Sequence, residues 1–185
     1  MMNRLSRICL IIPTFLLAAS PLLAQEKSRV SPHETVKAMI DGNEISVVYG
    51  RPYSKDPKSG EVRKVWGTLV PYGKTWRLGA DEATQLTTKQ PIEIGGKLVP
   101  AGSYSLFMSP EEGGAAKLIV NKQTGQWGTK YDQAQDLVRI DLKKEATASA
   151  VDQFTIEIEK NQGPGGVLMM MWENIQYSAP ITVKK

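Results

Sequence analysis

The chain alternates apolar and polar residues over many short stretches, which is the pattern of strands that bury one face. Glu44–Tyr49 is rich in β-branched residues, and in Gln153–Glu159 the residues Phe154, Ile156 and Ile158 share one face. Turn residues separate such runs at intervals of roughly 8–15 residues, and helical periodicity is almost lacking. The pattern predicts an all-β fold, a single β-sandwich of about ten short antiparallel strands, and leaves open a jelly-roll or an immunoglobulin-like connectivity.

The same pattern places the remaining elements. Gly95-Gly96 separates two short apolar stretches and predicts a β-hairpin. Two polar segments are expected to lie outside the sheets: an exposed loop at Ser54–Arg63 and a linker at Lys143–Ala150. Further strands are expected at Val36–Ile40, Ala116–Asn121, Leu137–Leu142, Val167–Trp172 and Ile175–Val183.

The first residues have the features of a secretory signal peptide rather than of a folded element. Arg4 and Arg7 precede a nearly continuous apolar run, and small residues follow it up to Ala24. We expect residues 1–24 to be removed, by cleavage after Ala24 or else after Ser20, which leaves 25–185 as one domain without an integral membrane span. The mature protein is therefore expected to be periplasmic or secreted.

Charge and cysteine content exclude several classes of protein. The full chain has 23 basic and 19 acidic residues. Removal of Arg4 and Arg7 leaves 21 basic residues, a formal charge of +2, with no basic stripe that indicates nucleic-acid binding. The single cysteine, Cys9, lies within the signal segment, so the mature chain is predicted to be disulfide-free and to lack thiol chemistry.

The richest group of chemically active side chains lies in Lys74–Thr84, around the corner Gly79-Ala80. Arg77 could be held bidentately by Asp81 or Glu82, which would make a purely structural clasp. Alternatively, the same residues could line a shallow pocket for an anionic or sugar-like ligand. The candidate binding residues are Arg51, Tyr72, Trp76, Arg77, Asp81 and Glu82.

The sequence supports no catalytic or metal centre. His33 is the only histidine, and no Ser-His-Asp triad or histidine-rich metal site can be assembled around it. Asp81 and Glu82 are adjacent, so in a regular strand they point apart and cannot act as a glycosidase pair. Asp132 and Asp136 lack the spacing of a calcium loop. We therefore predict no catalytic residues, no metal ligands and no cofactor.

Several short motifs are spread over nearly the whole of the predicted mature chain: Tyr49 to Pro52, Gly67 to Gly73, Trp76-Arg77, Gly79 to Thr84, Ile94 to Lys97, and Pro100 to Phe107. In these motifs the chain resembles a bacterial exported family that has no assigned activity, domain-of-unknown-function family 2911. The resemblance implies an exported β domain and gives no substrate. Two features depart from the family pattern: Asp81, where the family often has Asn, and a longer link at Ser54–Lys64. The first argues against acid–base chemistry at position 81.

These observations lead to an exported, non-catalytic binding or envelope-associated module. Its partner is expected to be a small molecule, a glycan or an envelope protein. One alternative is a hydrolase or isomerase that uses Arg77 with Asp81 or Glu82. Another is a structural or assembly protein that pairs with its partner through an edge strand such as Tyr177–Val183.

Overall fold

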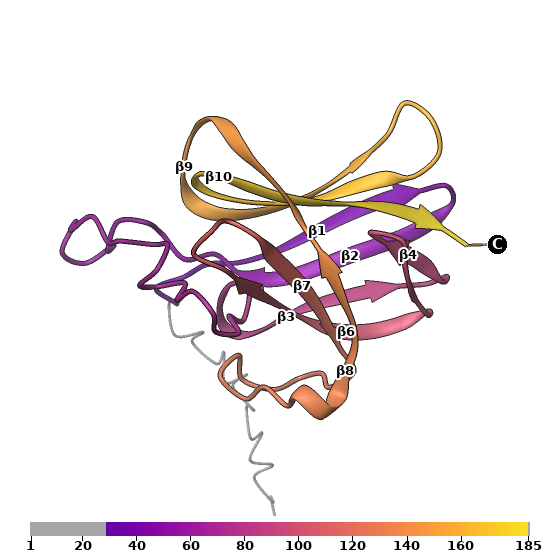
Figure 1. Ribbon diagram of the computed structural model, residues 1–185, viewed down its shortest axis with the longest axis horizontal. Helices are drawn as coiled ribbons and strands as arrows, with labels where there is room; N and C mark the ends of the chain where they lie inside the picture. The colour runs from indigo at the N-terminus through magenta and orange to yellow at the C-terminus, as the bar shows by residue number, and fades with distance from the viewer. Residues whose placement is uncertain (1–28, 185) are drawn as a thin grey trace, which may run out of the picture.

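The computed structural model describes residues 29–184, which form two antiparallel sheets packed face to face (Figure 1). The larger sheet has six strands in the order β1-β2-β3-β6-β7-β8. They are β1 (His33–Ile40), β2 (Asn43–Gly50), β3 (Ala80–Thr88), β6 (Gly102–Pro110), β7 (Ala116–Asn121) and β8 (Asp136–Asp141). A one-turn 3-10 helix, η1 (Gln133–Gln135), precedes β8.

The smaller sheet has four strands in the order β5-β4-β10-β9. The two long strands β9 and β10 form the upper layer of Figure 1, above β1 and β2. β1 also contacts β9, and β5 contacts β8, so the edges of the two sheets meet. The strands are β4 (Ile92–Ile94), β5 (Lys97–Val99), β9 (Lys143–Lys160) and β10 (Gly166–Val183).

The predicted all-β sandwich is confirmed, and the structure supplies the connectivity. Consecutive strands pair as neighbours through most of the larger sheet, as in a meander. The hairpin β4–β5 interrupts this order between β3 and β6, because it crosses to the smaller sheet and pairs with β10. Gly95 and Gly96, which close that hairpin, both have positive φ, as the turn requires.

The core lies between the sheets and is centred on stacked aromatic rings. The ring of Trp76 lies 4.9 Å from that of Phe154 and 5.9 Å from that of Trp172. Phe154 and Ile156 point inward from β9, as their period-two spacing predicts. Trp76 belongs to the segment between β2 and β3, and its backbone pairs with Met108 of β6. This pairing fixes the start of the corner at residues 77–82.

Residues 122–135 cover part of the outer face of the larger sheet. Phe107, which points outward from β6, is buried there against Tyr131 at 4.9 Å between ring centroids. Earlier in the same segment, the amide of Gly128 donates to the carbonyl of Asp81 at 2.9 Å. The segment therefore pairs with the beginning of β3, before β3 reaches its partner β6.

Two sequence expectations about the smaller sheet are wrong. Lys143–Ala150 is not a linker but the first part of β9, where backbone pairing with β10 compensates for a weak apolar pattern. Tyr177–Val183 is not an edge strand, because β10 lies between β4 and β9 and this segment pairs with both. The second correction removes the edge strand on which the assembly alternative was based.

The signal peptide predicted for residues 1–24, with its cleavage point, lies outside the described residues, and the assignment of 25–185 to one domain stays a prediction. Within residues 29–184, no helix has the length and apolar character that crossing a membrane requires.

Candidate functional site

The corner before β3 has an unusual backbone. Leu78 and Asp81 have φ of 52° and 62°, in the left-handed region that non-glycine residues seldom adopt. The buried hydroxyl of Thr84 donates to the carbonyl of Leu78 at 2.6 Å and holds the corner in place. Aspartate tolerates positive φ better than most residues, which suits it to position 81. Such strain is often found at ligand sites.

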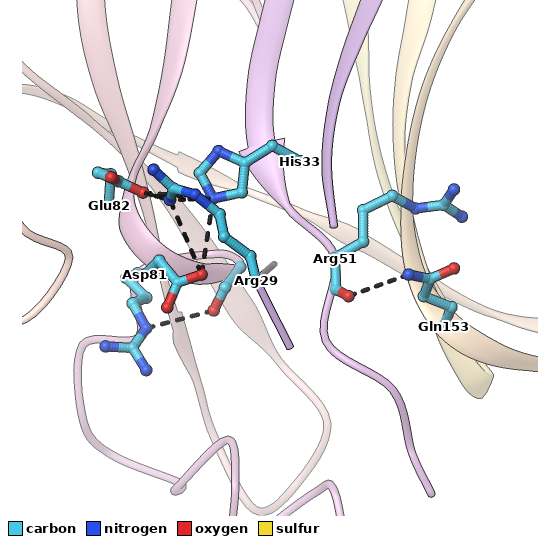
Figure 2. A network of polar contacts seen from close by, with 8 residues as sticks. Arg29, His33, Arg51, Asp81, Glu82 and Gln153 are labelled. Atoms are coloured by element: carbon cyan, nitrogen blue, oxygen red, sulfur yellow. Dashed lines mark hydrogen bonds and ion pairs between the residues drawn. The ribbon is translucent and has the colours of Figure 1, made fainter. Parts of the chain in front are cut away.

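The corner breaks the alternation of β3 and brings two adjacent carboxylates to one histidine. The Nε2 atom of His33 lies 3.2 Å from Oε2 of Glu82 and 3.6 Å from Oδ2 of Asp81 (Figure 2). In a regular strand these two carboxylates would point to opposite faces. The expectation that Asp81 and Glu82 diverge is therefore wrong, and the positive φ of Asp81 is the reason.

His33 reaches the cluster because of the strand register. His33 of β1 pairs with Gly50 of β2, and Gly50 pairs with Ala80 of β3, one residue before Asp81. The three strands thus place the imidazole next to the start of β3. This position was not recognised in the sequence, because 47 intervening residues separate His33 from Asp81 and only the pairing of β1, β2 and β3 brings them together.

Arg29 completes the cluster. Its Nη1 lies 2.6 Å from Oε2 of Glu82, 2.9 Å from Nε2 of His33 and 4.0 Å from Oδ2 of Asp81. The hydrogen bond from Arg29 is the largest of the effects that hold the pKa of Glu82 below its usual value. Nε2 of His33 thus faces the Arg29 guanidinium, which can only donate, and two carboxylate oxygens, which can only accept; whether Nε2 donates or accepts depends on the tautomer. All four side chains remain partly exposed to solvent.

The predicted clasp between Arg77 and the carboxylates is wrong. Nε of Arg77 donates to the carbonyl of Gly79 at 3.3 Å, while Asp81 and Glu82 face Arg29 and His33. Gly128 packs directly over Arg77: a Cβ on Gly128 would lie 2.8 Å from the Cβ of Arg77. The covering segment therefore fixes the course of the Arg77 side chain.

Arg51 and Tyr72 lie apart from the cluster. Arg51 points away from it in Figure 2, toward the smaller sheet, and Gln153 donates to its carbonyl at 3.1 Å. The Arg51 guanidinium donates to the hydroxyl of Thr155 at 2.8 Å and pairs with Glu34 at 2.8 Å. Tyr72 lies against Gly67, where an added Cβ would approach its ring to 3.0 Å.

A pocket of about 220 Å³ opens beside the corner, and Trp76, Arg77 and Asp81 of the predicted residues line it. Arg63, from the loop between β2 and β3, lines it as well, and we call this hollow the arginine pocket. Within residues 29–184, neither Arg63 nor Arg77 lies within ion-pair distance of a carboxylate. The Nε atom of Arg63 is buried and has no hydrogen-bond partner in the described chain.

A second hollow of about 200 Å³ also borders the cluster. His33, Glu82 and Gln126 line it, and the buried Oε1 of Gln126 has no hydrogen-bond partner among the described residues. The cluster therefore borders two hollows, with Asp81 lining the first and Glu82 the second.

Asp132 and Asp136 have structural roles. Asp132 caps η1 by accepting from the amide of Ala134 at 2.9 Å. Asp136 accepts from the hydroxyl of Tyr131 at 2.7 Å and pairs with Arg139 at 2.8 Å. Both carboxylates thus hold the covering segment in place.

Sequence reasoning selected Arg51, Tyr72, Trp76, Arg77, Asp81 and Glu82, considered His33 and rejected it, and did not select Arg29 or Arg63. His33 stands out as the only histidine, but no local signal distinguishes Arg29 and Arg63 from other charged residues, because their neighbours in the site lie far away in the chain.

The comparisons with known proteins give a family and no activity. Neither the curated proteins nor the solved structures gave a match. The model of the family described as "Protein of unknown function (DUF2911)" matches residues 31–181, which include β1 to β9 and all but the last two residues of β10. The chain belongs to the DUF2911 family.

Proposed function

We propose that this protein is an exported, non-catalytic binding module that holds a small anionic or sugar-like ligand in the arginine pocket. One observation carries the proposal: Arg63 and Arg77 line the same hollow, and neither is paired with a carboxylate within residues 29–184. A guanidinium presents donors in a planar fork that matches carboxylate and phosphate groups. An anionic group between the two would satisfy donors that the protein leaves available.

The walls of the pocket suit a small organic ligand. Trp76 and Trp172 contribute atoms to the lining of the pocket, although both rings are buried and stack on each other in the core. A volume of about 220 Å³ equals that of about seven liquid water molecules, which limits the ligand to roughly the size of one sugar or a short organic acid.

The signal-peptide pattern of residues 1–24 supports export to the periplasm or beyond. A ligand there would come from the cell envelope or from the medium. Uronic acids, sugar phosphates and short dicarboxylic acids combine the required charge and size. An envelope-associated role is compatible with the same pocket, because the terminal sugar of a glycan offers the same groups.

Binding should be tested with the purified, untagged protein by isothermal titration against uronic acids, sugar phosphates and dicarboxylic acids. We expect one of these classes to bind in a one-to-one ratio. Arg63→Gln and Arg77→Gln should each weaken binding about tenfold or more, which is the loss of one charge-assisted hydrogen bond. Lys160→Gln, at the exposed far end of β9, is the matched control for lost positive charge and should bind as the wild type does.

The proposal fails if no ligand of these classes binds, or if a ligand binds equally well to the wild type and both arginine variants. The unfolding midpoints of the wild type and of both variants should be measured as well, because they distinguish a loss of binding from a loss of folding. These midpoints are needed because each guanidinium also donates to a backbone carbonyl, that of Tyr53 for Arg63 and that of Gly79 for Arg77, so the substitutions are expected to cost some stability.

A further inference from the structure

We infer that His33, Asp81 and Glu82 form a binding site for one divalent transition-metal ion, and that Arg29 occupies the position of this ion in the metal-free protein. The inference goes beyond the proposed function, because the arginine pocket requires no metal. Its starting point is the convergence of one imidazole nitrogen and two carboxylate oxygens, all within 4.8 Å of one another.

The spacing of these atoms fits a first coordination shell. Zinc binds nitrogen and oxygen ligands at about 2.0–2.2 Å, so two ligands of a tetrahedral ion lie about 3.4 Å apart. Nε2 of His33 lies 3.2 Å from the nearer oxygen of Glu82 and 3.6 Å from that of Asp81. The three side chains therefore need only small rotations to close around an ion.

The position of Arg29 supports the same site. Its Nη1 makes close contacts with Glu82 and His33 and lies 4.0 Å from Asp81, so a positive group already stands among the three ligand atoms. A divalent ion entering the site would displace one guanidinium and meet two carboxylates.

The surroundings leave space for further ligands. The three protein groups account for three coordination positions, and an ion bound by three protein ligands keeps the others for water or substrate. Glu82 lines the hollow that contains the unpartnered Oε1 of Gln126, while Asp81 lines the arginine pocket. An ion held by both carboxylates would thus lie next to both hollows.

The donor set indicates which ions bind. One imidazole with two carboxylates suits Mn²⁺, Fe²⁺, Co²⁺, Ni²⁺ and Zn²⁺, whereas Ca²⁺ and Mg²⁺ favour oxygen ligands alone. Affinity should rise from Mn²⁺ toward Ni²⁺ and Zn²⁺ in the usual order for nitrogen and oxygen sites.

The experiment uses the purified protein without a polyhistidine tag, freed of metal by a chelator that is then removed. Zn²⁺, Co²⁺, Mn²⁺ and Mg²⁺ are titrated separately by calorimetry, and visible absorption follows Co²⁺. We expect one Zn²⁺ or Co²⁺ ion per chain and little binding of Mg²⁺. His33→Gln and Glu82→Gln should weaken binding beyond the roughly 10–100-fold that loss of a supporting contact costs. Asp81→Asn keeps a residue that tolerates positive φ and should also weaken binding.

The decisive variant is Arg29→Gln. If Arg29 competes with the ion, its removal should tighten Zn²⁺ binding about fivefold or more, the worth of a partly exposed ion pair. A gain in affinity cannot result from misfolding. Two matched controls should leave affinity unchanged: Arg139→Gln, which removes a guanidinium paired with Asp136, and Glu34→Gln, which removes a carboxylate next to His33 in the chain.

The inference is overturned if no ion binds stoichiometrically, or if His33→Gln and Glu82→Gln bind Zn²⁺ as the wild type does. It is also overturned if Arg29→Gln weakens binding. These results are separable from those on the arginine pocket, because the organic ligands are titrated without metal and respond to Arg63 and Arg77. If the protein binds a metal ion but none of the organic ligands, only the metal site is supported. If it binds an organic ligand but no metal ion, only the proposed function is supported.

Discussion

Gly50 of β2 faces His33 of β1, and the missing Cβ of Gly50 leaves the space in which the imidazole lies. A Cβ there would come within 3.1 Å of Nε2 of His33 and would collide with the carbonyl oxygen of Ala80. Glycine at this position therefore allows three neighbouring strands to approach closely at the start of β3. The geometry of the cluster depends on this absence of a side chain.

Gly50→Ala should consequently destabilise the protein and displace His33. The backbone carbonyl of Ala80 cannot move aside cheaply, so we expect a loss of about 1–3 kcal/mol in the free energy of unfolding, as for other overpacked sites. Urea denaturation measures this loss. Gly113→Ala is the control, because an added Cβ at Gly113 meets nothing within 4 Å. Equal stability of the two variants would show that the strands can separate at Gly50 without cost.

Arg51 is predicted to be a structural residue, in contrast to Arg63 and Arg77. Its guanidinium joins the end of β2 to β9 through Thr155 and the carbonyl of Phe154. Arg51→Met should therefore lower the free energy of unfolding by about 1–3 kcal/mol, since hydrogen bonds of a charged group are lost. Metal and ligand binding should persist.

Lys89→Met provides the comparison for Arg51→Met. Lys89 pairs with Glu44 at 2.9 Å but is largely exposed, and ion pairs of this kind contribute little to stability. Urea unfolding of the two variants should differ clearly. If Arg51→Met lost ligand binding but kept its stability, Arg51 would be a binding residue rather than a structural one.

Alkaline pH should destabilise the protein through Tyr49. Burial raises the pKa of Tyr49 to about 12, while its hydroxyl accepts from the amide of Ile156 at 2.8 Å and donates to Glu34 at 3.2 Å. In the unfolded chain a tyrosine has a pKa of about 10. The folded pKa is the higher one, so the stabilisation is complete below pH 10 and is lost as pH rises from 10 to 12. The loss should approach about 2–3 kcal/mol at pH 12.

The measurement is the free energy of unfolding between pH 9 and 12 for the wild type and Tyr49→Phe. The variant is expected to be less stable at neutral pH, because the amide of Ile156 loses its partner, but to fall less steeply above pH 10. The ultraviolet absorption of tyrosinate should show that the variant has one fewer tyrosine with a raised pKa than the wild type has. A slope identical to that of the wild type would exclude Tyr49 as its source, and Tyr131, whose pKa burial also raises to about 12, would be tested next.

The fold could be predicted from the sequence wherever the local pattern was sufficient. Phe154, Ile156 and Ile158 alternate with polar residues, and this spacing alone assigns the inner face of β9. Lys143–Ala150 failed the same test, because its small and polar residues carry no apolar pattern. It becomes a strand only through backbone hydrogen bonds with β10, which are a property of the pair of strands.

The same distinction applies to the candidate site, of which one part could be predicted from the sequence and another could not. The sequence by itself determined the corner with its Trp76, Arg77, Asp81 and Glu82, since turn residues and charges are concentrated there. Only the tertiary structure decided their partners, because contacts between residues far apart in the chain depend on strand register. Register brought His33 beside Asp81 and Glu82, and a positive φ at Asp81 turned both carboxylates to one side. A local pattern specifies which face a residue occupies, but it cannot specify what lies opposite.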